Sequence, residues 1–460
     1  MQTMKKALWP TLGWVGTLGL WSAGCVSPAV DADQDGASAE VDCNDADASI
    51  FPGATDIPYD GVDQDCSGKD LVDADSDGYD DTQDCNDADA QINPGASDAV
   101  IDAVDANCSG SDAKLTVVLS NSRSLGFYAP AYAISGVAVG DTSGKEIVYA
   151  SDPNRCVIWR LNPDGSVEVA VGALDSCGDS GDGGPATRAQ IGTTYDIQAV
   201  AHGTGHYLYL MDSGNNRLRR VMADGKIQTV AGNGDYDYYG DGGIATDAAL
   251  YYPYYFGVVT LQNGNDVIYL AESGSIRRVG PDGRINTVAG SRDYYADPMS
   301  EGSDGLSVYM GTIQELNPFI SSEGESIYFI SYDRYQIWRM APDQKLYATV
   351  GTGSGGYSGE GELALESSLY SPLGMAVDNP LKPTRLYFVD GSNYRVRVVN
   401  PDGRVYTVAG DGTNRQLEPG NATDTSIGYA SMLAHHGKGE LYFTFYNNDG
   451  TSGVAKLTPD

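Results

Sequence analysis

Short apolar runs separated by turn residues fill the chain from about residue 113 to its end. Each run is about five residues long and rich in tyrosine, valine and isoleucine, as in 207–211 and 217–221. Clusters of glycine, proline, asparagine and aspartate separate the runs. Runs of this length and composition are typical of β-strands. The pattern therefore predicts an all-β domain over residues 113–460.

A turn dipeptide ending in aspartate recurs through this domain at spacings of 60, 58, 61, 59 and 58 residues. Its copies begin at Pro163, Ala223, Pro281, Pro342, Pro401 and Pro459. Two apolar runs precede each turn, a run ending in glycine follows each of the first five, and a run of small residues lies further upstream. Four strands per repeat are typical of a propeller blade. The six copies predict a six-bladed β-propeller.

The sixth copy ends one strand short, at Asp460. The missing strand is present at the start of the domain, where residues 112–120 align with residues 224–232 of the second copy. We predict that the N-terminal strand 114–120 completes the last blade beside 453–458, because this closure removes exposed sheet edges.

Residues 31–112 form a different repeat, with a period of 42. This segment contains 24 acidic residues and one basic residue, so its formal charge is 1 − 24 = −23. Cys43 and Cys66 recur as Cys85 and Cys108, which predicts one disulfide inside each repeat. Cys156 and Cys177 remain in the first blade, and we expect them to pair as well.

Each acidic repeat begins with the alternating aspartates of a calcium loop. The second copy places candidate ligands at positions 1, 3, 5, 7, 9 and 12: Asp73, Asp75, Asp77, the Tyr79 carbonyl, Asp81 and Asp84. The first copy has Asp31, Asp33, Asp35 and Asp42 in register. Ala39 stands at its ninth position, which predicts a weaker site that needs water there. No flanking helices of an EF-hand are indicated, so we expect a small disulfide-stapled calcium-binding stalk.

Both repeat systems resemble known families. The acidic segment resembles thrombospondin type 3 calcium repeats and, more closely, the MopE-type metal-binding repeat of bacterial surface proteins. The later repeats resemble NHL repeats, through the turns 212–217 and 390–395 and the connectors 181–187 and 240–246. Although the MopE-type repeat is named after a copper protein, residues 31–112 contain no histidine, methionine or tryptophan. Carboxylate oxygens favour calcium or magnesium over copper, so we expect calcium as the cofactor.

The N-terminus predicts export. Lys5 and Lys6 precede an apolar run, residues 7–24, that is shorter than the ~20 residues needed to cross a bilayer, so we expect a signal peptide over 1–24. Its end resembles a bacterial lipoprotein lipobox, which implies a lipid-modified Cys25 and a tether over 25–30. Val26 replaces the aspartate associated with inner-membrane retention, which favours anchoring at the outer membrane or cell surface. The alternative is an ordinary signal peptide with an unmodified Cys25.

Charge and composition narrow the function of the propeller. The formal net charge of 28 − 63 = −35 argues against nucleic acid as a partner. No nucleophile elbow, phosphate loop or paired catalytic carboxylate is recognisable, and His202, His206, His435 and His436 fall in turns expected to be polar surface. We therefore expect a monomeric binding protein that is not an enzyme.

Tyrosines crowd the connectors and offer a surface for a protein or glycan ligand. The candidate ligand-binding residues are Tyr236, Tyr238, Tyr239, Tyr251, Tyr254, Tyr255, Tyr294 and Tyr295. Packing within the fold is the alternative explanation for these side chains. Two other functions stay open: a propeller-type enzyme, a lyase or lactonase with a metal in the central channel, and a purely structural envelope protein.

Overall fold

The computed structural model describes residues 30–121, 134–142, 144–291, 293, 296–437 and 439–460. The chain divides into two compact units, residues 1–90 and residues 91–460. Among the described residues, no helix combines the length and the apolar character that crossing a membrane requires.

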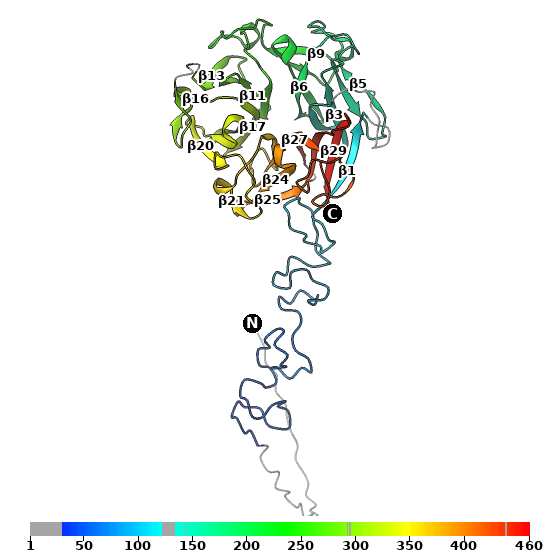
Figure 1. The fold of residues 1–460 in the computed structure, drawn as a ribbon, viewed down its shortest axis with the longest axis vertical. Helices are drawn as coiled ribbons and strands as arrows, with labels where there is room; N and C mark the ends of the chain where they lie inside the picture. The colour runs from blue at the N-terminus through cyan, green and yellow to red at the C-terminus, as the bar shows by residue number, and fades with distance from the viewer. Residues whose placement is uncertain (1–29, 122–133, 143, 292, 294–295, 438) are drawn as a thin grey trace, which may run out of the picture. The chain divides into compact units, whose positions relative to one another are not determined.

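Within the described residues, six antiparallel sheets form the blades of a propeller (Figure 1). Blade one consists of β2 (Val137–Thr142), β3 (Lys145–Asp152), β4 (Val157–Leu161) and β5 (Val167–Val171). Blade two consists of β6 (Thr194–His202), β7 (Gly205–Asp212), β8 (Arg217–Val221) and β9 (Ile227–Ala231). Blade three consists of β10 (Tyr255–Thr260), β11 (Asp266–Glu272), β12 (Ser275–Val279) and β13 (Ile285–Ala289).

The remaining blades follow the same order. Blade four consists of β17 (Ile313–Ser321), β18 (Gly324–Ser331), β19 (Gln336–Met340) and β20 (Lys345–Val350). Blade five consists of β22 (Pro372–Val377), β23 (Leu386–Asp390), β24 (Arg395–Val399) and β25 (Arg404–Ala409). Blade six consists of β27 (Tyr429–His436), β28 (Glu440–Tyr446), β29 (Ser452–Pro459) and β1 (Ala113–Ser120). The predicted all-β, six-bladed propeller is confirmed.

The first strand of the propeller closes its last blade. β1 pairs antiparallel with β29, with Leu115 opposite Leu457, and Figure 1 shows the two strands side by side in cyan and red. This pairing joins the start of the domain to its end within one sheet. The predicted closure by the N-terminal strand is confirmed.

The connectors between blades cover the outer edges of the sheets. The two-residue strands β15 (Ser303–Asp304), β21 (Glu362–Leu363) and β26 (Gly420–Asn421) pair with β20, β25 and β1. Single bridges do the same in blades two and three, where Pro185 pairs with Lys226 and Ile244 with Arg284. A further two-residue pair, β14 (Asp297–Pro298) with β16 (Val308–Tyr309), is parallel. In blades two to six the outer strands therefore offer few free backbone groups to other chains.

Single turns of 3-10 helix occur in the connectors and in the turns between second and third strands. The connectors contain η1 (Ala186–Arg188), η3 (Ala245–Asp247), η4 (Gly305–Ser307) and η6 (Ala364–Glu366). The turns contain η2 (Ser213–Asn215), η5 (Tyr332–Arg334) and η7 (Gly391–Asn393). A left-handed residue ends each of these turns: Asn216 (φ 50°), Tyr335 (φ 52°) and Tyr394 (φ 53°). Blade four thus keeps the turn geometry of blades two and five although its sequence departs from theirs.

A buried arginine of the third strand ties the preceding connector to each of three blades. Arg219 of β8 is 1% exposed and contacts Asp182 of the connector and Asp212 at the end of β7. Arg277 occupies the same place in blade three and pairs with Asp241 and Glu272. Arg397 does so in blade five and pairs with Glu360 and Asp390. These ion pairs explain the acidic residue in the glycine-rich connectors as a structural feature.

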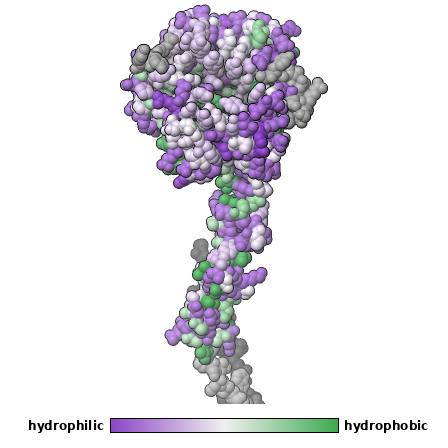
Figure 2. All heavy atoms as spheres, in the orientation of Figure 1, coloured by the Kyte–Doolittle hydropathy of each residue, from purple (hydrophilic) through white to green (hydrophobic). Residues whose placement is uncertain are grey.

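The last part of the second acidic repeat packs on the propeller. Ile101 is fully buried in a cluster with Leu115 and Tyr387. Arg385 forms an ion pair of 2.7 Å with Asp102, whose backbone carbonyl accepts a hydrogen bond from Asn400. Residues 91–112 therefore belong to the same compact unit as the blades. Figure 2 shows that hydrophilic residues cover most of the visible face of this unit.

The described part of the first unit, residues 30–90, consists of turns and bends without regular strands or helices. Its few apolar side chains are mostly exposed, Val30, Val41 and Ile57 among them. Side-chain carboxylates accept hydrogen bonds from nearby backbone N–H groups throughout the segment, and a disulfide closes the first repeat. These interactions replace an apolar core.

Candidate functional site

The first acidic loop wraps its backbone around its own carboxylates. Asp31 accepts hydrogen bonds from the N–H groups of Gln34 (2.6 Å) and Gly36 (3.1 Å). The residue at the turn is glycine, with φ +103°, because an L side chain rarely adopts this backbone conformation. The turn brings the carboxylates of Asp33, Asp35 and Asp42 together, with oxygen atoms within 4.8 Å of one another.

One oxygen of each of these three carboxylates receives no hydrogen bond. The Oδ1 atoms of Asp35 and Asp42 accept the N–H groups of Ala37 and Asn44, both at 2.8 Å. The Oδ2 atoms of Asp33, Asp35 and Asp42 are buried and have no hydrogen-bond partner. Buried carboxylate oxygens without partners are costly unless a cation neutralises them. The loop therefore has the arrangement of a cation site.

The second loop repeats the arrangement. Asp73 accepts hydrogen bonds from the N–H groups of Asp77 (3.2 Å) and Gly78 (3.0 Å). The Oδ2 atoms of Asp75 and Asp77 are again buried without partners. Asp84 of the same loop is buried and accepts a hydrogen bond from the N–H of Asn86.

In the second loop, the predicted ligands at positions nine and seven differ from the others. Asp81 is exposed, whereas Asp75 and Asp77 are partly buried. Tyr79 donates its N–H to Asp77, and its backbone carbonyl is the predicted ligand atom. The two loops thus share a core of aspartates at positions 1, 3, 5 and 12.

A carboxylate beyond the twelve-residue loop joins each site. Asp45 accepts a hydrogen bond from the N–H of Ala32 and lies within 4.8 Å of Asp31 and Asp33. Asp87 accepts a hydrogen bond from the N–H of Ala74, and its Oδ1 is buried without a hydrogen-bond partner. The sequence offered these residues only as further carboxylates of unassigned role. The period of 42 relates Asp45 to Asp87 and is the signal that marks them as one structural position.

Each repeat also ends in a short loop of the same kind. Asp63 accepts the N–H groups of Ser67 (2.9 Å) and Gly68 (2.7 Å), as Asp31 does with Gln34 and Gly36. Asp105 accepts the N–H groups of Ser109 and Gly110 at the same distances. The aspartates at these positions therefore order backbone turns.

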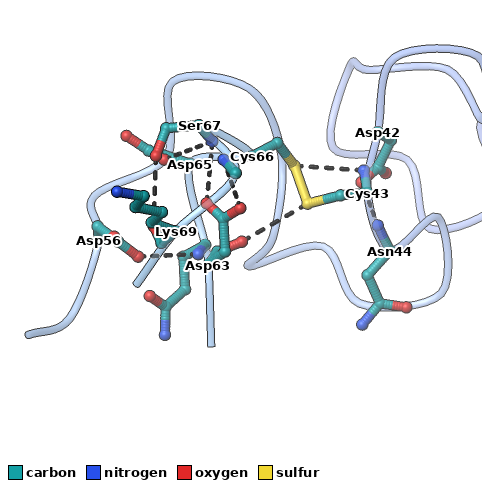
Figure 3. The surroundings of a disulfide bond; sticks show 11 residues. Asp42, Cys43, Asn44, Asp56, Asp63, Asp65, Cys66, Ser67 and Lys69 are labelled. Carbon is teal, nitrogen blue, oxygen red and sulfur yellow. Dashed lines mark hydrogen bonds between the residues drawn. A yellow bond between two sulfur atoms is a disulfide. The ribbon is translucent and has the colours of Figure 1, made fainter. Parts of the chain in front are cut away.

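A disulfide holds the two loops of the first repeat together. Figure 3 shows the bond between Cys43 and Cys66, with Asp42 on one side and Asp63 and Asp65 on the other. The Cα atoms of the cysteines are 5.7 Å apart, and the N–H of Cys43 donates to the sulfur of Cys66. Cys85 and Cys108 are also disulfide-bonded, and Cys156 pairs with Cys177 in blade one. The three predicted disulfides are confirmed.

The acidic loops offer hard oxygen donors alone. Every cysteine described in the repeats is engaged in a disulfide, so no thiolate is free to bind a metal. Lost hydration, with the charges of neighbouring carboxylates, raises the pKa of Asp33 and Asp75. A bound cation would reverse this effect by favouring the ionised form. The donor set fits a hard divalent cation.

The candidate tyrosines divide between surface and interior. Tyr236 is 50% exposed and its ring contacts those of Tyr251 and Tyr252 at 5.0 and 4.8 Å, while Tyr252 stacks on Tyr254 at 6.1 Å. Tyr239 is exposed and hydrogen-bonded to Asn233 and Asp235. We call Tyr236, Tyr251, Tyr252 and Tyr254 the tyrosine cluster.

Two other candidate tyrosines are part of the fold. Tyr238 is partly buried, bonds to Thr287 and lies 4.8 Å from the guanidinium of Arg277. Tyr255 is partly buried on the innermost strand of blade three. Tyr294, Tyr295 and Cys25 lie outside the described residues.

The histidines of blade six are not surface groups, contrary to expectation. His436 is 6% exposed and contacts Asp141 of blade one at 3.1 Å and Glu440 at 3.2 Å. Burial lowers the pKa of His435, whose ring stacks on Tyr387. The expectation failed because β27 extends to His436, so both side chains pack against neighbouring blades instead of projecting from a turn. His202 is exposed, and His206 is partly buried against Tyr149.

The sequence did not predict two buried carboxylates on the innermost strands of the propeller. Asp196 and Glu315 lie on the innermost strands of blades two and four, 1% and 4% exposed. The apolar residues around them gave no sign of an acidic site, and 119 positions separate them in the sequence (315 − 196).

Comparison with known families identifies the acidic repeats. Residues 42–70 and 84–113 match the MopE-type family model described as "Putative metal-binding motif". This result and the observed fold confirm a metal-binding repeat region followed by a six-bladed propeller, as the sequence predicted. The chain therefore contains two copies of a metal-binding motif.

Solved structures with the same architecture support the fold. A Bacteroides thetaiotaomicron protein of unknown function is 15% identical, with a TM-score of 0.52 over 76% of each chain. An auxiliary nutrient binding protein from Bacteroides ovatus is 15% identical, with a TM-score of 0.50 over 76% of this chain and 77% of its own. Both likenesses concern the fold.

One relative found by sequence matches part of this chain. Teneurin-m of Drosophila melanogaster is 29% identical over 190 residues, which are 38% of this chain and 6% of that protein. The chain thus spans a small fraction of the length of this curated relative.

Proposed function

We propose that the protein is a calcium-binding protein of the cell envelope or surface, whose propeller binds a protein or glycan. The observation that carries the proposal is the set of buried, partnerless oxygens of Asp33, Asp35, Asp75 and Asp77. Calcium suits them because it accepts many carboxylate oxygens in a flexible geometry, whereas copper prefers nitrogen and sulfur ligands. Millimolar calcium outside the cell would occupy sites even of modest affinity.

The tyrosine cluster is the proposed recognition surface. Exposed tyrosines combine a large apolar ring with a polar tip and lose little entropy on binding, which suits protein or glycan ligands. Tyr236, Tyr252 and Tyr254 are each more than two fifths exposed and lie in mutual contact through their rings. The proposed activity is binding without catalysis.

The proposed location rests on the N-terminal sequence and on the repeats. A signal peptide ending before Cys25 would export the chain and attach it to a membrane by lipid alone. The disulfides suit an oxidising compartment. One solved neighbour is described as an auxiliary nutrient binding protein, which supports a binding role.

A binding screen tests the recognition surface. Full-length protein in calcium is applied to glycan and envelope-protein arrays beside a variant carrying Tyr236→Ser, Tyr252→Ser and Tyr254→Ser. A control variant carries Tyr446→Ser, an exposed tyrosine of blade six. We expect the triple variant alone to lose ligands that the wild type binds. An unchanged binding profile in the triple variant would contradict the proposed surface.

A further inference from the structure

The centre of the propeller contains a cavity of about 540 Å³. Its wall is largely apolar and comes from the innermost strands of the blades, with Val139, Val200, Val258, Val377 and Leu433 among the lining residues. Asp196 and Glu315 line the same cavity together with the amides of Gln198 and Asn317. An apolar cavity with a few convergent polar groups is the usual form of a small-molecule site.

Local irregularities of the strands aim both carboxylates into the cavity. Glu315 lies in a bulge of β17, between Gln314 and Leu316, and has a φ of +40°. Asp196 lies in the corresponding irregularity of β6, between Thr194 and Ile197. Bulges re-aim side chains, and residues in rarely populated backbone conformations concentrate at functional sites. Comparable irregularities occur near the start of β22 and β27, and those in β6 and β17 are the ones that carry carboxylates.

The pair lacks a positive partner. Asp196 accepts a hydrogen bond of 2.8 Å from the N–H of Phe256, but Oε2 of Glu315 is buried without any partner. Among the described residues, no lysine or arginine lines the cavity; its other titratable lining residues are His206, His435, His436, Asp141 and Asp378. Burial raises the pKa of Asp196 to about 7, and burial with the nearby Asp196 charge raises that of Glu315. A bound cation would remove this cost.

The oxygen donors and the apolar wall of the cavity favour an organic cation over a metal ion. Calcium takes six to eight oxygen ligands and magnesium an octahedron, whereas the pair supplies two carboxylates. The amide oxygen of Gln198 already accepts the N–H of Val258 at 2.9 Å. Carboxylates suit an ammonium group, and the apolar wall suits a hydrocarbon body.

We propose that the central cavity binds a small organic ammonium ion, whose N–H groups donate to Asp196 and Glu315 and whose apolar body contacts the cavity wall. The cavity lining includes none of the tyrosine cluster and none of the acidic loops. This site is therefore independent of the proposed recognition surface and of the calcium sites, and each can fail alone.

Calorimetric titration of hexylammonium into the full-length protein tests the site, with calcium present to fill the acidic loops. We expect saturable binding of one equivalent that weakens at least about tenfold in Glu315→Gln, since a tenfold change corresponds to ~1.4 kcal/mol. Glu323→Gln is the matched control, because Glu323 is an exposed glutamate near the end of the same strand. Hexanol, which has the same chain without the charge, should bind far more weakly than hexylammonium.

Asp196→Asn provides a second variant, because its amide oxygen still accepts the N–H of Phe256. Thermal melting shows which variant is folded, and a folded variant of either residue suffices. Equal hexylammonium affinity in wild type and the folded variant would overturn the proposal. A magnesium or calcium equivalent that is bound by the wild type and lost in Glu315→Gln would also overturn it, since it would assign the pair to a metal.

Discussion

Arg219 donates a hydrogen bond of 2.7 Å from Nη2 to Oδ1 of Asp182, joining the third strand of blade two to the connector that precedes it. The guanidinium is buried and also donates to the backbone carbonyls of Gln190 and Ser180. The ion pair thus fixes the path of the connector between two blades.

Replacing Asp182 with asparagine should destabilise the propeller in a pH-dependent manner. Burial alone would raise the pKa of Asp182, but hydrogen bonds from Thr229 and Arg219 lower it below its usual value. Its stabilisation is therefore present above about pH 4, the ordinary pKa, and is lost as the pH falls through the lower folded-state pKa. We expect Asp182→Asn to cost about 1 kcal/mol at pH 7, allowing for the partial exposure of the carboxylate, and less below pH 3.

Denaturant titration followed by tryptophan fluorescence at pH 7 and at pH 2.5 measures this difference. Glu366→Gln removes an exposed carboxylate of another connector and should change little at either pH. A cost for Asp182→Asn that stays constant with pH would argue against the ion pair as its source.

Leu115→Ala should weaken the closure of the propeller. Leu115 is buried in β1 opposite Leu457, so the truncated side chain leaves a cavity in blade six. Such changes typically cost about 2–5 kcal/mol, while Thr116→Ala on the exposed face of the same strand should cost little. Thermal melting compares the two variants, and equal melting temperatures would contradict closure by this strand.

Removing the first disulfide should impair the first acidic loop only. Asp42 precedes Cys43, so the disulfide fixes the carboxylate at position 12. We expect Cys43→Ser with Cys66→Ser to weaken calcium binding by this loop at least roughly tenfold, because disulfides closing loops of this size typically contribute about 2–4 kcal/mol. Calorimetry should detect the loss of one class of sites with the other unchanged. Unaltered binding isotherms would contradict this coupling.

Cys25→Ser should release the protein from membranes. A lipid on Cys25 is the only anchor that the proposal invokes, so the variant should move to the soluble fraction after cell lysis. Immunoblots of membrane and soluble fractions measure the distribution, with Ser27→Ala as the neighbouring control. A variant that remains in the membrane fraction would argue against lipidation.

The repeats made most of the architecture predictable from the sequence. The period near 59 placed the blades and the missing strand, and this strand pairs with β29 as expected. The period of 42 placed the aspartates of both loops and two of the three disulfides, and the third was predicted from the two cysteines left in blade one. Repeats are informative because each copy reports independently on the same local structure.

Contacts between distant segments could not be predicted in this way. Ile101 belongs by sequence to the acidic repeat but is buried in the propeller unit, because its surroundings come from blades five and six. Asp196 and Glu315 occupy bulges, and a bulge shifts which residues of a strand face inward. His436 was misplaced because the length of β27 decides whether it lies in a turn.

The central claim is that the alternating aspartates bind calcium, and calorimetric titration of the full-length protein with calcium tests it most directly. The account predicts that calcium binds with measurable heat at two classes of sites. One class should be lost in Asp33→Asn with Asp35→Asn, and the other in Asp75→Asn with Asp77→Asn. Asp89→Asn, which changes an exposed aspartate outside the twelve-residue loop, should alter the second site far less than Asp75→Asn with Asp77→Asn. A titration without binding heat at several temperatures, or isotherms that none of these variants changes, would contradict the account.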